Sequence, residues 1–290
     1  MIKGFVYTIA LCIGLSTGAQ AANFEFGTGV KSPDGEISYD IGISKLQFNI
    51  APKQSQFYNM TLPVGNMELR TEFEKNESFL QEDSFLDTDY NSDKSIAIQS
   101  QADTTLAYET AKAQLVMPLI SNADFSLNVG AGYHKETFDY TVSNGVQTNY
   151  NTQTQVTYGE NALTYHYESS IPHLLLEMEY QVGIFRPFLS LAASPIAEVT
   201  AVDDHVLRKK VAKFKSSGNW FDGTVGMMMN IMPNMELKLA YQFQSLSTTG
   251  EHTQTRYEAT SEGDVGHIWT AAHITEQKSQ SAIANLSITF

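Results

Sequence analysis

Apolar and polar residues alternate with a period of two along much of the chain. The clearest segments are 45–50, 67–73, 125–133, 174–184, 224–231 and 236–243. In the third of these, Phe125, Leu127 and Val129 are separated by polar or small residues. Successive side chains of an extended strand point to opposite faces, so each segment is predicted to be a β-strand with one apolar face.

Two kinds of connection take turns between these strands. Short segments rich in Pro, Gly, Asn and Asp lie at 63–66, 121–124, 183–187 and 233–234. Long polar stretches lie between them, at about 74–105, 135–168, 199–217 and 246–277. Short turns on one side and long loops on the other are typical of a bacterial outer-membrane barrel. The chain is therefore predicted to be an all-β, transmembrane up-and-down antiparallel β-barrel of about ten strands with long extracellular loops.

The last residues agree with a barrel strand. Leu286, Ile288 and Phe290 alternate with Ser287 and Thr289. A final strand ending in an aromatic residue resembles the signal that outer-membrane assembly machinery reads. The alternative is the last strand of a soluble β-sandwich.

The first residues have the pattern of a secretory signal peptide. Lys3 precedes an apolar run from Gly4 to Leu15, and Ala19-Gln20-Ala21 forms a small-residue cleavage site. We expect residues 1–21 to be removed and residues 22–290 to form one barrel domain. Cys12, the single cysteine, falls in the removed part, so the mature chain is expected to have neither a disulfide nor a thiol nucleophile.

The chain is strongly acidic, with a formal net charge of −14. Such a chain repels a phosphate backbone, so no nucleic acid is expected as a partner. An acidic cleft would instead attract cationic peptides. Surface acidity that serves only solubility is the alternative explanation.

Two polar segments carry the candidate chemistry. They are Asp87-Thr88-Asp89 and Asp203-Asp204-His205. If the fold brings them together, two acid pairs and an imidazole would face a common gap and could activate water. Taken separately, each could be a solvated loop, and D-x-D also occurs in calcium loops. The other histidines lack metal-ligand spacing, and no serine sits in G-x-S-x-G, so no metal or other cofactor is expected.

Five short motifs, in order along the chain, resemble those of the omptin family of outer-membrane endopeptidases. They are Asp87-Thr88-Asp89 before an aromatic Tyr90 (D-x-D-W in the family), Asp103-Thr104-Thr105-Leu106-Ala107-Tyr108 (D-T-x-L-x-Y), Gly130-Ala131-Gly132-Tyr133, Asp203-Asp204-His205 (D-x-H) and Met232-Pro233-Asn234 (T-P-N). The resemblance runs from about Phe26 to Phe290. It implies a ten-stranded barrel with the active site at the extracellular rim.

The resemblance also implies roles for four residues. Asp203 would orient His205, the general base, while Asp87 and Asp89 would hold the attacking water across the cleft. Paired carboxylates share a proton, and a carboxylate beside a histidine favours the imidazolium, so these roles are physically consistent.

The chain departs from the family pattern at specificity and lipid positions. The pocket acid expected two residues before Asp203 is Ala201, and Asp40 is near the other expected acid. Family members need lipopolysaccharide, held by arginines, whereas the matching positions here are Thr137 and Glu168. Asp204 replaces a family glutamate and keeps the charge.

Together these features predict an outer-membrane, omptin-like endopeptidase with its active site facing the extracellular side. Its expected partners are cationic peptides or exposed protein loops and the outer-membrane lipid, with lipopolysaccharide as the activating lipid that the resemblance implies. One alternative is a catalytically inactive omptin-fold barrel that serves as an adhesin or structural protein. A small pore is a further alternative, although a barrel of about ten strands is close to the size that side chains can fill.

Overall fold

The computed structural model describes residues 24–51, 54–260 and 264–290. The predicted signal peptide, residues 1–21, lies outside these ranges. The described chain consists of β-strands and their connections. No helix within it is long and apolar enough to cross a membrane.

The described residues form thirteen strands in one antiparallel sheet. Their bounds are β1 Glu25–Asp40, β2 Ser44–Ile50, β3 Ser55–Val64, β4 Met67–Lys75, β5 Phe79–Tyr90, β6 Ile96–Ser121, β7 Phe125–Asn149, β8 Thr154–Tyr158, β9 Leu163–Tyr180, β10 Phe185–His205, β11 Lys210–Met232, β12 Met235–Arg256 and β13 Ile268–Thr289.

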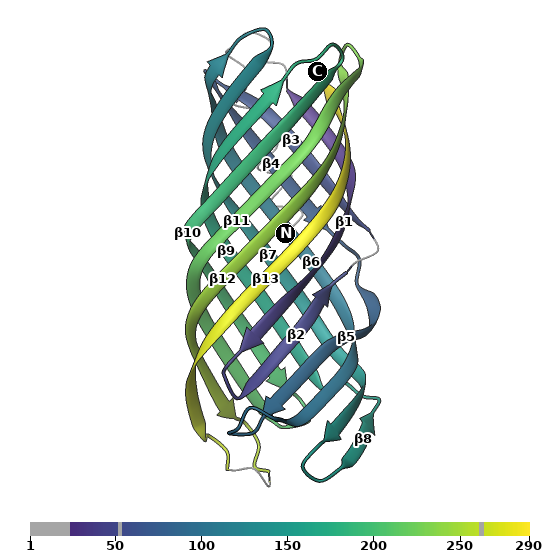
Figure 1. Cartoon of the computed structure of the whole chain (residues 1–290), viewed down its shortest axis with the longest axis vertical. Helices are drawn as coiled ribbons and strands as arrows, with labels where there is room; N and C mark the ends of the chain where they lie inside the picture. Colours follow the sequence, from purple (N-terminus) through teal and green to yellow (C-terminus); the bar gives the residue numbers. More distant parts are fainter. Residues whose placement is uncertain (1–23, 52–53, 261–263) are drawn as a thin grey trace.

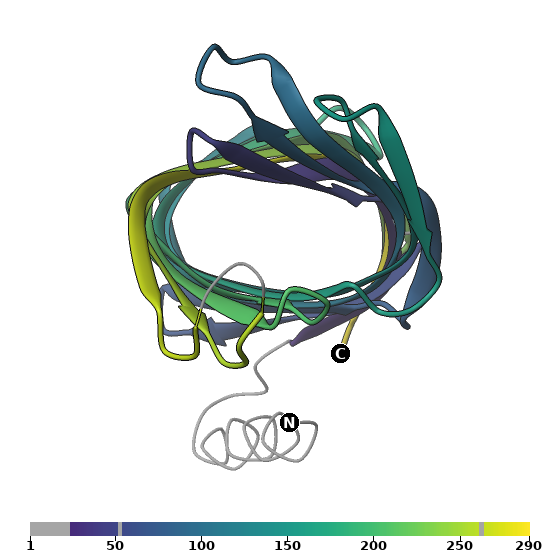
Figure 2. The same ribbon diagram turned by 90° about the horizontal axis from the view of Figure 1, so that it is seen from below.

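These strands occupy ten positions around a closed ring (Figures 1 and 2). β2 and β3 pair one after the other along β1, so they share a position. β4 and β5 share another along β6, and β8 pairs with β7 as an added hairpin strand. β1 pairs with β13 and closes the ring. This pairing closes the sheet into a ring, as a membrane-spanning sheet requires. The predicted fold is confirmed.

The four predicted short turns join β3 to β4, β6 to β7, β9 to β10 and β11 to β12. They lie at the end of the barrel where Phe290 donates its backbone N–H to the carbonyl of Phe24. At the other end, most of each long polar stretch is strand rather than irregular loop. The connections there are residues 41–43, 91–95, 150–153, 159–162, 206–209 and, after β12, the described residues 257–260 and 264–267.

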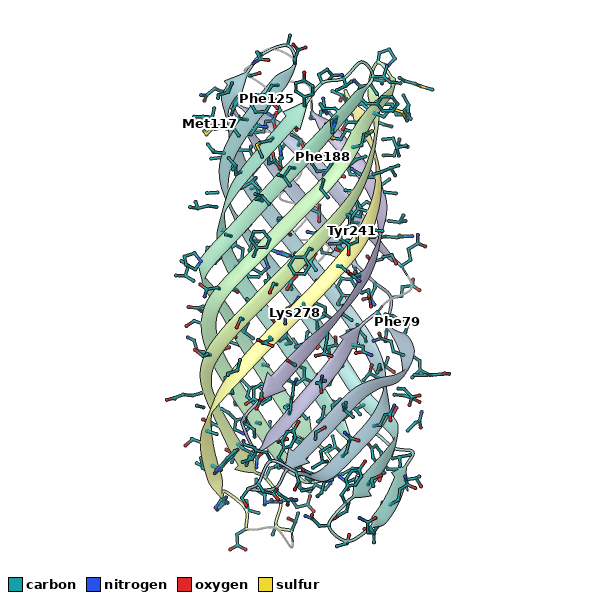
Figure 3. All side chains as sticks on the ribbon, in the orientation of Figure 1. Phe79, Met117, Phe125, Phe188, Tyr241 and Lys278 are labelled. Carbon is teal, nitrogen blue, oxygen red and sulfur yellow. The ribbon has the colours of Figure 1, made fainter. Side chains whose placement is uncertain are left out.

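A belt of apolar side chains covers the outside of the half that carries the short turns. Figure 3 shows Met117 and Tyr241 on this outer surface. The belt includes Leu115, Met117, Leu119, Ile120, Leu174, Leu176, Phe221, Val225, Met227, Leu239, Tyr241 and Phe243, all exposed. Apolar side chains on the outside and polar ones inside are the pattern of a barrel in lipid. Beyond the belt the pattern reverses, and buried aromatic residues fill the interior.

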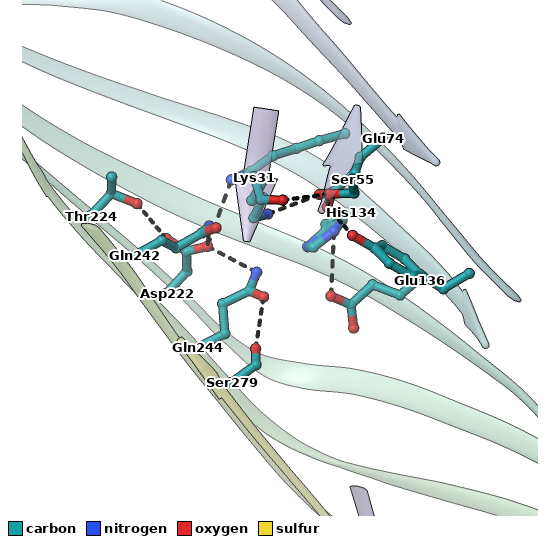
Figure 4. Close-up of polar contacts among 12 residues, drawn as sticks. Lys31, Ser55, Glu74, His134, Glu136, Asp222, Thr224, Gln242, Gln244 and Ser279 are labelled. Atoms are coloured by element: carbon teal, nitrogen blue, oxygen red, sulfur yellow. Dashed lines mark hydrogen bonds and ion pairs between the residues drawn. The ribbon is translucent and has the colours of Figure 1, made fainter. Parts of the chain in front are cut away.

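Buried polar side chains cross the interior between the belt half and the aromatic half (Figure 4). Lys31 Nζ lies 2.9 Å from Glu74 Oε2, and Glu74 also accepts hydrogen bonds from Ser55 and Tyr108. On the facing wall, Asp222 accepts hydrogen bonds from Gln244 (3.0 Å) and from other neighbours. A cavity of about 600 Å³ lies on the short-turn side of this network. None of the candidate catalytic residues lines it.

Candidate active site

Asp203 and His205 lie at the end of β10, next to the turn that leads to β11. The prediction that they lie in a loop is wrong, because β10 continues through His205 and pairs with Lys210 of β11. Residues two apart on a strand share a face, so both side chains project from the same side of β10. His205 Nε2 lies 2.8 Å from Asp203 Oδ2. Asp203 is 2 % exposed, which makes it a buried carboxylate partnered by one imidazole nitrogen.

Asp87 and Asp89 lie on β5, which is also strand rather than the predicted loop. A register shift against β6 between Gln81 and Phe85 precedes them, with Asp83 in a left-handed conformation (φ 49°). Such a bulge redirects the side chains that follow it. Asp87 is 8 % exposed and accepts a hydrogen bond from Ser44 Oγ at 3.3 Å.

β5 and β10 come from different parts of the ring, separated by β6, β7 and β9. The charges of His205 and Asp203 nevertheless reach Asp87. Burial, the largest effect, and the nearby Asp89 carboxylate raise the pKa of Asp87 to about 6. Arg208 and His205 act in the opposite direction. The fold therefore brings the two predicted motifs into one electrostatic cluster, beyond the apolar belt.

The sequence reasoning missed Arg208 and Tyr158. Arg208 follows His205 in the turn between β10 and β11, and its guanidinium lies 3.8 Å from Asp89 Oδ2. Burial and the charge of Asp87 raise the pKa of Tyr158, on β8, and Arg208 lowers it. A basic residue three positions after His205 was the available signal for Arg208. No local pattern marks Tyr158.

The positions that depart from the family pattern lie in different surroundings. Ala201 is 3 % exposed, pairs with Phe214 of β11 and belongs to the buried apolar cluster. Asp40 ends β1 and accepts a hydrogen bond from the backbone N–H of Gly42 at 2.6 Å. Thr137 and Glu168 are register partners on β7 and β9, and Lys135 Nζ lies 3.0 Å from Glu168.

Within the part of the chain that the structure describes, no group of three or more His, Cys, Asp or Glu side chains could hold a metal ion. The groups assembled at this site are four acid/base side chains and one guanidinium. Such a set can hold a water molecule, remove a proton from it and stabilise the imidazolium that results.

Comparison with solved structures supports the same architecture. The outer membrane protease OmpT from Escherichia coli superposes with a TM-score of 0.80 at 14% identity, covering 95% of this chain and 100% of OmpT. OprG from Pseudomonas aeruginosa (TM-score 0.41, 11% identity, 94% and 98% coverage) and Neisserial surface protein A (0.28, 8%, 92% and 97%) share less of the geometry. No curated protein matches the sequence.

The sequence also matches a family model, and this match is independent of the superposition. The model is that of the omptin family, and it aligns with residues 78–287. The aligned region contains both acidic motifs and extends from the residue before β5 almost to the end of β13. The chain therefore belongs to the omptin family.

Proposed function

We propose that this omptin is an outer-membrane endopeptidase that hydrolyses peptide bonds with an activated water molecule. The observation that carries the proposal is the electrostatic coupling of Asp87 to the Asp203–His205 pair, which comes from a distant part of the ring. Two chain segments that are far apart contribute complementary acid/base groups to one place. Such an arrangement is a common mark of an active site.

In the proposed reaction, Asp87 and Asp89 accept hydrogen bonds from the attacking water. Nε2 of His205 is held by Asp203, so Nδ1 takes the water proton as the oxygen attacks the peptide carbonyl. Asp203 stabilises the imidazolium formed in that step. His205 then returns the proton to the leaving amine as the C–N bond breaks, and no covalent enzyme intermediate forms.

The proposed substrates are cationic peptides or exposed protein loops outside the cell. The net charge of −14 favours association with cationic chains. The apolar surroundings of Ala201 argue against an acidic primary pocket at that position. We therefore propose that positive charge improves substrate capture without being required at the residue before the cleaved bond. The apolar belt supports placement in the outer membrane, with the site at the end opposite the short turns.

A catalytically inactive adhesin or structural barrel is the second candidate. The absence of the expected acid at Ala201 and the position of Arg208 beside Asp89 favour it. An inactive barrel needs neither a buried carboxylate with a raised pKa nor an imidazole paired to Asp203.

The test uses the refolded barrel with a library of cationic and neutral peptides, with and without lipopolysaccharide. The control is the Asp87→Ala, His205→Ala double variant, shown to be folded by its heat-modifiable electrophoretic migration. We expect cleavage by the parent and none by the variant. If neither folded protein cleaves any peptide, with or without lipopolysaccharide, the result would support the adhesin or structural function instead.

A further inference from the structure

The proposed reaction creates a negative charge that none of its four residues can stabilise. When water adds to a peptide carbonyl, the carbonyl oxygen becomes an oxyanion, and enzymes place hydrogen-bond donors where that charge develops. Asp87, Asp89 and Asp203 are only acceptors when they are ionised. His205 is paired with Asp203 through Nε2, 2.8 Å away, and its Nδ1 takes the water proton in the proposed reaction. A fifth group is therefore needed as the donor.

Arg208 contacts both halves of the site. Its backbone N–H donates to the carbonyl oxygen of His205 at 3.0 Å, which fixes it beside the end of β10. Its guanidinium lies 3.8 Å from Asp89 Oδ2 on β5. The two side chains are 28 % and 27 % exposed, so a substrate can reach both.

The guanidinium has N–H groups that are free to bind a substrate. At 3.8 Å it attracts the Asp89 carboxylate without a hydrogen bond, because N–H···O hydrogen bonds are about 2.7–3.2 Å long. It makes no hydrogen bond to any other described residue. Arginine presents five N–H donors in one plane and stays protonated in proteins. The hydroxyl of Ser44, in contrast, already donates to Asp87 at 3.3 Å.

The turn that carries Arg208 is held by the end of β12. Lys209 has a left-handed conformation (φ 54°), and its carbonyl oxygen accepts a hydrogen bond from the backbone N–H of Tyr257 at 3.0 Å. Arg256, 8 % exposed, donates from Nη1 to the carbonyl oxygen of Arg208 at 3.0 Å. A donor on a backbone fixed in this way needs little rearrangement when the charge on the substrate develops.

The charges around Asp87 favour a cation at this place. Burial, then Asp89 and more weakly Asp203, raise the pKa of Asp87 to about 6, whereas Arg208 and His205 act to lower it. Of these groups only Arg208 is a permanent cation. An oxyanion formed next to the ionised carboxylates would be repelled by them, and a fixed positive charge offsets that repulsion.

We propose that Arg208 is a catalytic residue whose guanidinium donates hydrogen bonds to the oxyanion. As the water oxygen bonds to the carbonyl carbon, the π electrons of the C=O bond move to the carbonyl oxygen, and the water proton passes to His205 Nδ1. When the C–N bond breaks, the C=O bond forms again and His205 returns the proton to the leaving amine. Arg208 neither gains nor loses a proton. The inference rests on the proposed function and adds to it the group that stabilises the developing charge.

Four variants of the refolded barrel, each shown to be folded by its heat-modifiable migration, test this role by peptide cleavage across about pH 5–9. Arg208→Gln removes the charge, Arg208→Lys keeps the charge without the planar set of donors, and Arg208→Ala leaves space for an added guanidinium ion. Lys209→Gln is the matched control. It removes a positive charge from the same turn, but this lysine lies 3.7 Å from Glu258 and away from Asp89.

We expect Arg208→Gln to lower kcat about 100-fold with little change in KM, because the donor acts in the transition state. The loss should remain at about pH 8.5, where Asp87 is ionised in parent and variant alike. Arg208→Lys should recover part of the rate. Millimolar guanidinium should raise the rate of Arg208→Ala about 10-fold, and Lys209→Gln should stay within about 2-fold of the parent.

The plateau rate decides between this role and other roles of Arg208. If Arg208→Gln regains the parental kcat at about pH 8.5, the proposal is overturned and only an effect on the pKa of Asp87 is left. A faster Arg208→Gln variant, or one in which only KM changes, would also overturn it, by making Arg208 a block or a simple binding contact. In each of these cases the parent still cleaves. A parent that cleaves no peptide would overturn the proposed function, and this role with it.

Discussion

Asp87 is the residue at which function and stability oppose each other. Burial disfavours its charged form, and Asp89 adds repulsion. Its folded-state pKa of about 6 is higher than the ordinary aspartate value of 3.8, so the folded state binds more protons between these two pH values. The free energy of unfolding should therefore fall as the pH rises from about 4 to 6 and stay lower above that range. A buried carboxylate whose ionisation destabilises the folded state is useful only if its charge is needed for function.

Asp87→Asn should relieve this destabilisation. Asparagine keeps an oxygen that can accept from Ser44 but carries no charge. We expect the variant to be more stable than the parent by up to about 3 kcal/mol at pH 8 and by little at pH 4. Urea unfolding in lipid vesicles at the two pH values measures the difference. A stability gain that is the same at both pH values would show that the charge of Asp87 is not its source.

Arg208 should set the pH at which the cluster becomes active. Its guanidinium lowers the pKa of Asp87, so Arg208→Gln should raise that pKa and move the acid limb of peptide cleavage to higher pH. Lys209→Gln is the matched control, because Lys209 pairs instead with Glu258 at 3.7 Å. A limb that moves equally in both variants would indicate a general charge effect rather than this contact.

At the residue scale, the sequence predicts a contact when the two residues that make it are also close together along the chain. Asp203 and His205 lie two apart and meet at 2.8 Å on one strand. Tyr39 and His252 meet only because β1 and β12 curve round to face the same interior, so no local pattern could reveal their hydrogen bond.

At the scale of the strand, the same alternation has opposite meanings in the two halves of the barrel. In β9, Tyr165 and Tyr167 are buried in the interior, whereas Leu174 and Leu176 are exposed on the belt. The apolar face thus changes from the inside to the outside along one strand. Alternation predicts that a strand has two unlike faces, but it cannot tell which face meets lipid, since that depends on where the membrane ends. For the same reason, the prediction that the long polar stretches are loops is wrong. They are mostly strands whose outward side chains are polar because that face meets water.

A pair of substitutions on the outer face of β9 tests this division. Leu174→Arg places a charge in the belt and should destabilise the folded barrel by about 2–4 kcal/mol in lipid vesicles. Thr164→Arg, also outward and exposed but in the protruding half, should change stability by less than about 0.5 kcal/mol. Urea unfolding followed by tryptophan fluorescence measures both. Equal effects would place the membrane boundary elsewhere.

At the scale of the whole molecule, an interior network joins four consecutive positions of the ring. Lys31 of β1 and Glu74 of β4 are both buried, and Ser55 of β3 and Tyr108 of β6 complete the contacts around Glu74. The number of ring positions was predictable, because turn chemistry and chain length determine it. The network was not, because its members are single polar residues scattered over strands that look alike in sequence.

Breaking the buried ion pair should be strongly destabilising. Lys31→Met leaves Glu74 charged and unpaired and should lower the free energy of unfolding by about 3–5 kcal/mol. Lys31→Met with Glu74→Gln removes both charges and should recover most of that loss. Urea unfolding of the two variants provides the comparison. A double variant as unstable as Lys31→Met would mean that packing, rather than the unpaired charge, is responsible.

The most direct test of the account is the rate at which four single variants cleave the best library peptide. The variants are Asp87→Asn, Asp89→Asn, Asp203→Asn and His205→Gln, each confirmed to be folded. The account predicts that the parent cleaves and that each variant loses about 100-fold or more in kcat/KM, since each substitution removes one group from a shared acid/base step. Parent-like cleavage by the Asp203→Asn and His205→Gln variants would contradict the assignment of this cluster as the active site.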